Sequence, residues 1–259
     1  METQEYKTMN QLERAYWWFH GKRFLVEMLL NRLIKVEAEP PSLLDIGCGT
    51  GMIMELLNGF GKAYGIDFSP QAIQILKHHK VKSLVHADAT RSIPFKSATF
   101  FAITSLDVLE HVDDDVSALE EAFRVCKPGG YMLLTVPAFD ILWSSHDVAL
   151  HHKRRYKRTQ ILNKATGLGW QVTMCSYYNT ALFLPILLFR KIGNRRKGTP
   201  KVESDFSIHL PQWLNRILSF LFTSEIRILR YIDLPFGVSL ISVLRKPVEL
   251  PGRKRCDET

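Results

Sequence analysis

Three glycines at alternate positions constrain this chain more than any other feature. Residues 43–53 read Leu-Leu-Asp-Ile-Gly-Cys-Gly-Thr-Gly-Met-Ile, so an apolar run ends in an acid and passes through a glycine loop into a helical segment. Glycine lacks a Cβ atom, which lets the main chain turn sharply and lets a small ligand touch it. A dinucleotide-binding loop, G-x-G-x-x-G, would need its third glycine at position 52, where the chain has Met52. The loop therefore predicts a strand–loop–helix unit that binds a small ligand, and it argues against a nicotinamide dinucleotide.

A second acid supports a nucleoside ligand. Residues 63–66 form the next short apolar run, and Asp67 follows it, 22 residues after Asp45. In a βαβ unit, an acid about 20 residues further on reaches a ribose hydroxyl. A carboxylate there can accept hydrogen bonds from both hydroxyls of an unphosphorylated ribose. Asp67 alone could equally be a solvated turn acid, and the glycine loop favours the ribose.

Strand and helix patterns alternate along the chain. Strands are expected near residues 42–46, 62–67, 82–86, 100–106, 131–136, 169–175 and 237–244, with helices near 9–36, 51–58, 70–79, 115–126 and 159–166. Such a βαβα series predicts an α/β fold, a Rossmann-like doubly wound sheet of seven mainly parallel strands. A helical N-terminal cap precedes the sheet, and about 60 residues with a helical pattern lie between the last two strands.

Five motifs follow the predicted strands in order. They are residues 45–51, Asp67, residues 86–89, residues 105–112 and residues 123–134. Together they resemble, over roughly residues 40–137, the class I S-adenosylmethionine-dependent methyltransferases. The resemblance implies S-adenosylmethionine as cofactor and S-adenosylhomocysteine as product. The residues that it places at the cofactor are Asp45, Gly47, Cys48, Gly49, Gly51, Asp67, Phe68, Asp88, Ala89, Leu106 and Asp107.

The resemblance also divides the chain. Residues 1–40 are expected to form the cap, and residues 41–178 together with 236–247 the cofactor-binding methyltransferase domain. Residues 179–235 form the helical insertion, and residues 248–259 a basic tail.

The aromatic run at the start of the cap has two interpretations. Trp17, Trp18 and Phe19 are consecutive. We expect Trp18 to lie at the cofactor pocket, because an aromatic face attracts a sulfonium charge. The alternative is that these rings anchor the first helix to the sheet.

A segment rich in histidine follows the fifth strand and is the expected place of the chemistry. His146 and His151 are candidate general bases, because histidine titrates near neutral pH. Asp147 could orient one of them, and Tyr156 lies in the same segment. Alternatively the segment only closes over the cofactor. Its spacing matches no strong ligand signature, so we predict no metal.

Charge is unevenly distributed and suggests an anionic partner. Residues 1–150 carry a net charge of −5 and residues 151–259 a net charge of +13. Arg154 and Arg155 could bind a phosphate or carboxylate through two hydrogen bonds each. His111 is a further candidate for substrate binding, although a packing role would explain it equally well.

The insertion between the last two strands also allows two interpretations. Residues 181–189 are apolar and residues 190–197 basic, whereas residues 210–232 mix apolar residues with arginines. An apolar helix face flanked by arginines suits an interfacial helix on anionic lipid. The alternative is that the two segments pack on each other as a hydrophobic lid over the active site, with residues 190–197 as a surface loop. Both together would admit a greasy substrate.

Composition and cysteine usage bear on location. The four cysteines show no C-x-x-C spacing, so reduced thiols are expected. No signal peptide is recognised, and no run reaches the roughly 20 apolar residues that span a bilayer. We expect a cytoplasmic protein, with peripheral contact to the inner face of the membrane left open.

These patterns favour one function over two others. Residues 16–19 and the histidine segment resemble a bacterial subgroup of the methyltransferases assigned to lipid, glycan or secondary metabolism. We therefore predict O- or N-methylation of a small-molecule, lipid-linked or glycan-type acceptor. The alternatives are an RNA ribose methyltransferase and a non-catalytic cofactor-binding module. Nucleic acid is disfavoured because residues 107–109 do not match the motif of base-amine methylation.

Overall fold

The computed structural model describes Glu13 and residues 16–34, 39–77, 83–195 and 210–248, with the side chains of residues 192–195 left aside. Its centre is a seven-stranded sheet in the order β3-β2-β1-β4-β5-β7-β6. The strands are β1 (Ser42–Ile46), β2 (Lys62–Asp67), β3 (Leu84–His86), β4 (Phe100–Leu106), β5 (Cys126–Pro137), β6 (Gln171–Tyr178) and β7 (Ser239–Arg245). The first five are parallel, and β7 runs antiparallel to both β5 and β6. The predicted seven-stranded, mainly parallel fold is confirmed.

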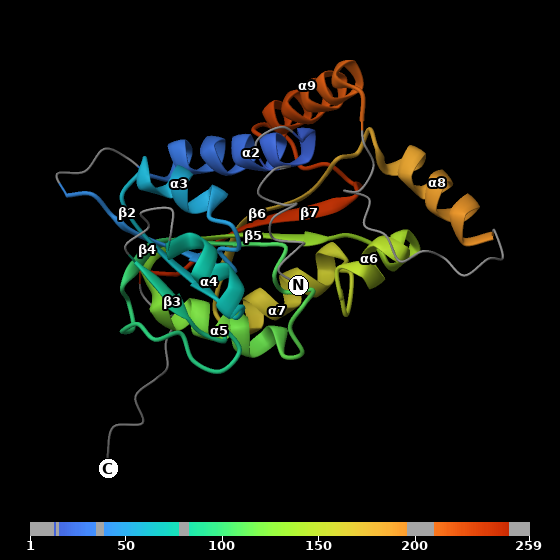
Figure 1. Cartoon of the computed structure of the whole chain (residues 1–259). Coiled ribbons are helices and arrows are strands. Elements are labelled where there is room, and N and C mark those ends of the chain that lie inside the picture. Colours follow the sequence, from blue (N-terminus) through green and yellow to red (C-terminus); the bar gives the residue numbers. More distant parts are fainter. Residues whose placement is uncertain (1–12, 14–15, 35–38, 78–82, 196–209, 249–259) are drawn as a thin grey trace, which may run out of the picture.

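Helices cover both faces of this sheet (Figure 1). One face carries α2 (Trp17–Leu33) and α3 (Met52–Asn58), with α9 (Gln212–Ile228) lying on α2. The other face carries α5 (Asp115–Val125) and α7 (Arg158–Gly167), while α4 (Pro70–Lys77) packs on β2 and β3. Helix α5 begins where the carboxylate of Asp114 accepts a hydrogen bond from the backbone N–H of Ser117 at 3.0 Å, a common way to satisfy a free amide at a helix start.

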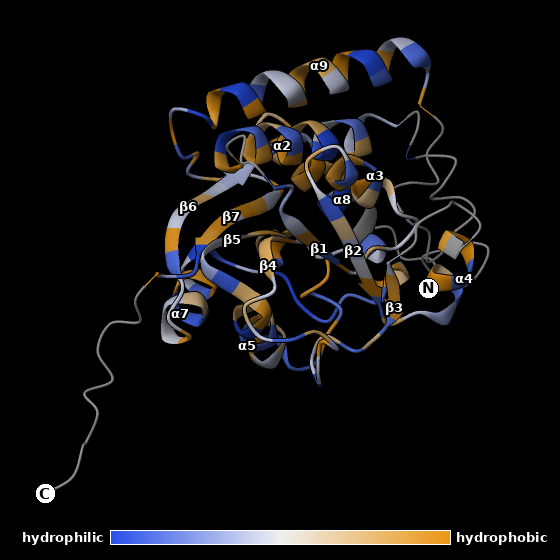
Figure 2. Ribbon diagram, turned by 90° about the vertical axis from the view of Figure 1, so that its left-hand side faces the viewer, coloured by the Kyte–Doolittle hydropathy of each residue, from blue (hydrophilic) through white to orange (hydrophobic). Residues whose placement is uncertain are grey.

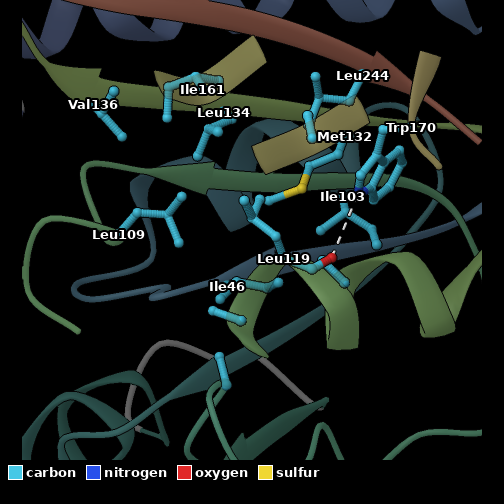
Figure 3. Close-up of a cluster of buried hydrophobic side chains, with 14 of the residues drawn as sticks. Ile46, Ile103, Leu109, Leu119, Met132, Leu134, Val136, Ile161, Trp170 and Leu244 are labelled. Atoms are coloured by element: carbon cyan, nitrogen blue, oxygen red, sulfur yellow. Dashed lines mark hydrogen bonds between the residues drawn. The ribbon is translucent and has the colours of Figure 1, made fainter. Parts of the chain in front are cut away.

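Consecutive strand residues supply two separate hydrophobic cores. Leu43 and Leu133 pack on the α2 and α3 side, whereas Leu44 and Leu134 pack on the α5 and α7 side. This alternation is expected of strands buried on both faces. Figure 3 shows the second core, closed by Trp170, whose indole N–H donates to the backbone carbonyl of Leu119 at 3.4 Å. In Figure 2, hydrophobic residues recur along the strands of the sheet, as expected of strands that are buried on both faces.

Three elements differ from the sequence-based expectation. Strand β5 starts at Cys126 and not near residue 131, because residues 127–130 join the sheet: the N–H of Gly129 donates to the carbonyl of Lys246 at 2.8 Å. Helix α8 (Phe183–Arg195) continues through most of the basic run that we expected to form a loop. A short helix, α6 (Ser145–Ala149), forms inside the histidine segment. Of the predicted cap and tail, residues 1–12 and 249–259 lie outside the described residues.

The insertion is helical, as predicted. It lies between β6 and β7 and contains α8 and α9. Helix α9 lies along α2, and α8 projects beyond the edge of the sheet, at the right of Figure 1. Among the described helices, none has the length and apolar character needed to cross a bilayer.

Candidate active site

One large cavity opens at the carboxyl ends of the parallel strands, next to the point where the strand order reverses between β1 and β4. Ligands of open α/β sheets bind at such a switch point. The cavity has a volume of about 1110 Å³. Apart from Gly51, the predicted cofactor residues all line it: Trp18, Asp45, Gly47, Cys48, Gly49, Asp67, Phe68, Asp88, Ala89, Leu106 and Asp107.

The glycine loop leaves main chain exposed to this cavity. Gly47, Gly49 and Gly51 have φ angles of 73°, 50° and 91°, a region that other residues rarely adopt. A Cβ atom at Gly47 would lie 2.4 Å from Val108, and one at Gly51 would lie 2.3 Å from Leu76. At Gly49 the nearest atom beyond its chain neighbours would be 3.9 Å away. Gly51 therefore serves packing at the start of α3, whereas Gly49 borders open space that a ligand can fill.

Two buried acids flank the loop. The hydroxyl of Thr104 donates to Asp45 at 2.6 Å, and the backbone N–H groups of Gly49 and Ser69 each donate to Asp67 at 2.8 Å. Burial raises the pKa of both carboxyls, that of Asp45 to about 7, with the neighbouring Asp67 adding to the rise. A cationic ligand would relieve this cost, and Asp67 keeps lone pairs for ribose hydroxyls. The site therefore fits S-adenosylmethionine, which carries a sulfonium and an ammonium group.

The cap helix also contributes to the site. Lys22 of α2 forms a buried ion pair with Asp107 at the end of β4, and the hydroxyl of Thr135 donates to the same carboxylate at 2.8 Å. Burial alone would raise the pKa of Asp107, but the charge and hydrogen bond of Lys22 outweigh it and lower the pKa. The Lys22 ammonium lies 5.5 Å from the centroid of the Trp18 ring. The sequence analysis missed Lys22, which carries no motif.

The aromatic run lies between the cavity and the insertion. Trp18 lines the cavity, so its predicted contact with the cofactor stays a prediction. Trp17 is buried, and its ring centroid lies 5.8 Å from that of Phe222 on α9. This ring therefore helps to hold α2 against the insertion, whereas the sequence alternative was an anchor to the sheet.

The histidine segment is organised around one buried carboxylate. Asp147 is fully buried and receives hydrogen bonds from His152 Nδ1 at 2.9 Å, from Arg155 at 2.8 and 3.0 Å, and from the backbone N–H of Ser144 at 2.9 Å. Burial would raise its pKa, but the His152 hydrogen bond and the Arg155 charge lower it to about 2. The histidine that Asp147 holds is His152, whereas our sequence candidates were His146 and His151. Both of those line the cavity as well.

His152 also belongs to a second cluster, with Glu110 and His111, that lines the cavity. Ligand atoms of Glu110, His111 and His152 all lie within 4.8 Å of one another, and among the described residues this is the one such group that could hold a metal ion. Neither carboxyl oxygen of Glu110 has a hydrogen-bond partner, and burial raises its pKa well above the ordinary value. Burial lowers the pKa of His111 to about 4, so this ring is neutral at neutral pH. Lys153 N–H donates to the Glu110 carbonyl at 2.7 Å and ties the two loops together.

The remaining predicted residues lie elsewhere or have other partners. Tyr156 is buried outside the cavity lining, and its hydroxyl donates to Asp115 at 2.8 Å. Arg154 also lies outside the lining and pairs with Asp115 at 3.3 Å. Arg155 lines the cavity, but its guanidinium is bound to Asp147. The structure thus brings His111, His146 and His151 together at the cavity and separates Tyr156 and Arg154 from it.

The insertion supplies the apolar wall of the cavity. Residues from α8, from α9 and from the segments that precede them contribute Leu182, Pro185, Ile186, Phe189, Leu210, Leu214 and Leu218. Acidic side chains, among them Asp45, Asp67 and Asp107, line the same cavity. The cavity therefore combines a glycine loop, a histidine cluster and apolar residues of the insertion.

Part of this chain is similar in sequence to known methyltransferases. Residues 44–134 match a family profile described as "Methyltransferase domain". A ubiquinone biosynthesis O-methyltransferase from Alkalilimnicola ehrlichii is 35% identical over 100 residues, which cover 36% of this chain and 40% of that protein. Its counterpart from Thiobacillus denitrificans is 30% identical over 131 residues, 46% of this chain and 56% of that protein. The chain thus spans about half the length of these relatives or less.

Solved structures agree in fold. A SAM-dependent methyltransferase from Archaeoglobus fulgidus has a TM-score of 0.54 and 19% identity, covering 86% of this chain and 94% of that one. Phosphoethanolamine N-methyltransferase 2 from Haemonchus contortus, in complex with S-adenosyl-L-methionine, has a TM-score of 0.54 and 20% identity, covering 86% of this chain and 52% of that one. The predicted resemblance to class I methyltransferases is confirmed.

Proposed function

We propose, from the methyltransferase domain that residues 44–134 form, that this chain is an S-adenosylmethionine-dependent O-methyltransferase of small molecules with an apolar body. One observation carries the proposal: the glycine loop with its acids and the histidine cluster open into the same cavity. A methyl donor and an acceptor can therefore meet there, and holding two reactants in line supplies much of the rate enhancement of such a transfer.

The chain's own residues divide the work of binding the methyl donor. Asp67 would accept hydrogen bonds from the ribose, and the main chain at Gly49 leaves room for the amino-acid end. The side of the purine would rest against Phe68, which is 71% exposed at the cavity edge, with Asp88 beside it. When bound, the cofactor supplies a methyl group on a positively charged sulfur, and Asp45 lies buried nearby to favour that charge.

The chemical nature of the acceptor is inferred from the part of the cavity lining that the insertion contributes. Apolar side chains of α8 and α9 face the cavity, so the body of the acceptor is hydrophobic. The acids that line the cavity disfavour a phosphate or carboxylate near the reacting atom. Arg155, which we expected to bind such a group, is already bound by Asp147. The curated relatives carry names that refer to O-methylation in ubiquinone biosynthesis, and this supports a hydroxyl as the acceptor over an amine.

The outer surface of the insertion supports contact with a membrane. Exposed apolar side chains on α8 and α9 outside the cavity lining are Leu184, Leu188, Trp213, Ile217, Phe220, Leu221 and Ile228. Arg216 and Arg227 are the exposed charged residues of α9, whose acid Glu225 is occupied by the backbone N–H of Thr180 at 2.9 Å. An apolar helix face with cationic neighbours binds anionic lipid. We therefore propose peripheral attachment through this surface, which would bring the lid to a lipid-soluble acceptor.

The experiment that tests the function uses methyl-labelled S-adenosylmethionine with an extract of the source cells. After the reaction, label is separated into organic solvent, small aqueous metabolites and RNA. Label in organic solvent is the expected result. Label in RNA would favour ribose methylation instead. Cofactor binding in calorimetry with no label in any fraction would favour a non-catalytic cofactor-binding module.

Membrane attachment is tested separately, by sedimentation with vesicles that contain phosphatidylglycerol. Trp213→Ser and Phe220→Ser should weaken binding, since both side chains are more than 60% exposed and make little folding contribution. Ile141→Ser, also exposed but outside the insertion, is the matched control. Equal binding of all variants would contradict the proposed surface.

A further inference from the structure

We propose that His152, oriented by Asp147, is the general base that removes the proton from the acceptor hydroxyl. This inference rests on the proposed O-methyltransferase function and adds a catalytic residue to it. It also replaces His146 and His151, which the sequence favoured for this task.

The orientation of the His152 ring is fixed by its partner. Its Nδ1 atom lies 2.9 Å from Asp147 Oδ1. Asp147 is held in turn by two hydrogen bonds from Arg155 and one from the N–H of Ser144. An ionised carboxylate can only accept hydrogen bonds, so Nδ1 carries the proton and Nε2 keeps its lone pair. A base held by a buried carboxylate in this way is the arrangement that activates hydroxyl nucleophiles in several enzyme classes.

The ring lies at the acceptor end of the cavity. His152 lines the cavity, and its side chain is only 7% exposed. Its centroid lies 4.8 Å from that of His111 and 6.1 Å from that of His146. The carboxyl of Glu110 completes this end and has no hydrogen-bond partner although it is fully buried. An unpartnered buried carboxyl indicates a polar ligand atom at this place, and an acceptor hydroxyl would supply it.

The charges around His152 come from every neighbouring element. They are Asp107 after β4, Glu110 and His111 in the following loop, Asp147 of α6, Arg155 and, from α8, Arg190. Arg155 and Arg190 both face Asp147 and keep it ionised. Burial lowers the pKa of His111 to about 4 and raises the pKa of Glu110 well above its ordinary value. His152 is the ring whose Nδ1 atom faces the fixed carboxylate of Asp147.

The step balances without a further reagent. The acceptor O–H bond breaks as its proton passes to Nε2 of His152. A lone pair of the acceptor oxygen forms a bond to the methyl carbon, and the carbon–sulfur bond breaks with its electron pair going to sulfur. The products are a methyl ether, the neutral thioether S-adenosylhomocysteine and a His152 imidazolium, which releases its proton to solvent.

The decisive experiment compares two alkylated phenols as acceptors. One has a pKa near that of tyrosine, about 10, and the other bears nitro groups and is already ionised at the assay pH. His152→Ala should lower kcat/KM for the weakly acidic phenol by roughly 10²–10⁴-fold, and by less than about tenfold for the ionised one. Asp147→Asn should show the same selectivity to a smaller degree. His20→Gln, which alters an exposed histidine bonded to Ser219, is the control and should change neither value.

Other outcomes separate this inference from the function on which it rests. Equal losses on both phenols, with cofactor binding intact in calorimetry, would overturn the base assignment and leave the methyltransferase standing. Transfer to neither phenol by the wild type would overturn the hydroxyl premise. Loss of wild-type activity on chelation, restored by Mg²⁺ or Mn²⁺, would assign the cluster to a cation instead. Nitrogen NMR of the imidazole rings gives a readout without turnover: His152 should be the Nδ1–H tautomer in the wild type and lose that preference in Asp147→Asn.

Discussion

Gly21 tests whether the insertion packs on the cap as the structure has it. Gly21 lies in α2 at its contact with α9, and a Cβ atom there would lie 2.0 Å from Cδ1 of Phe222. Carbon atoms in contact are about 3.5–4.0 Å apart, so the Phe222 ring would have to move by roughly 1.5 Å. Overpacking of this kind costs about 1–3 kcal/mol, whereas alanine in place of glycine within a helix returns about 1 kcal/mol. Gly21→Ala should therefore lower the free energy of unfolding by up to about 2 kcal/mol, or Tm by up to roughly 8 °C.

The assay is urea and thermal unfolding of a matched set of variants. Gly167→Ala in α7 is the control, because a Cβ atom at Gly167 meets no other atom within 4 Å. It should leave stability unchanged or raise it by up to about 1 kcal/mol. In a Phe222→Ala background the clash is gone, so Gly21→Ala should become neutral or stabilising, a coupling of about 1–3 kcal/mol. If Gly21→Ala raised Tm as much as Gly167→Ala, α9 would not lie on α2 at this place, and the lid would lose its anchor.

Three further predictions concern the cofactor end. Asp67→Ala should weaken S-adenosylmethionine binding by roughly 10²–10⁴-fold in calorimetry, because it removes hydrogen bonds to a charged acceptor worth about 1.5–3 kcal/mol each. Asp114→Ala, which affects only the cap of α5, is the control. Unchanged affinity in Asp67→Ala would refute the ribose assignment. Gly49→Ala should lower the free energy of unfolding by only about 1–2 kcal/mol, because alanine would have to adopt the φ of 50° that Gly49 has. The same change should abolish the rise in Tm that the cofactor produces. A normal cofactor-induced rise would show that the ligand does not approach this residue. Burial raises the pKa of Asp45 from 3.8 to about 7, so the stability that its protonated form contributes is complete below pH 4 and is lost as pH rises through 7. Urea unfolding without cofactor should therefore show the free energy of unfolding falling by roughly 2–4 kcal/mol over this range, and by less in Asp45→Asn. Identical pH profiles for the two proteins would contradict the shift.

Local patterns were sufficient to predict the sheet, and the reason is physical. Leu43 and Leu44 are adjacent yet enter different cores, so a continuous apolar run can only be a strand covered on both faces. The glycine loop likewise encodes its own conformation, because positive φ at Gly47 and Gly49 is costly for any other residue. Turn signals were less informative. Residues 127–130 look like a turn, but the hydrogen bonds between Gly129 and Lys246 that extend β5 join positions far apart in the chain.

The same limit explains why the sequence did not indicate which histidine lies against Asp147. Asp147 is adjacent to His146 in sequence, and this favours their pairing when nothing else is known. In the structure Asp147 is the third residue of α6, and its carboxylate turns back to accept the N–H of Ser144 at the start of that helix. A carboxylate in that position points into the protein, where the chain returns after α6 with His152 and Arg155. Under our proposal the base is therefore selected by α6, a five-residue helix whose position no sequence periodicity predicts. Lys22 was missed for a related reason, since its partner Asp107 lies 85 residues away. Contacts between residues that are far apart in the sequence depend on tertiary packing. The conformation of the glycine loop depends on the residues within the loop, so it can be predicted from the sequence.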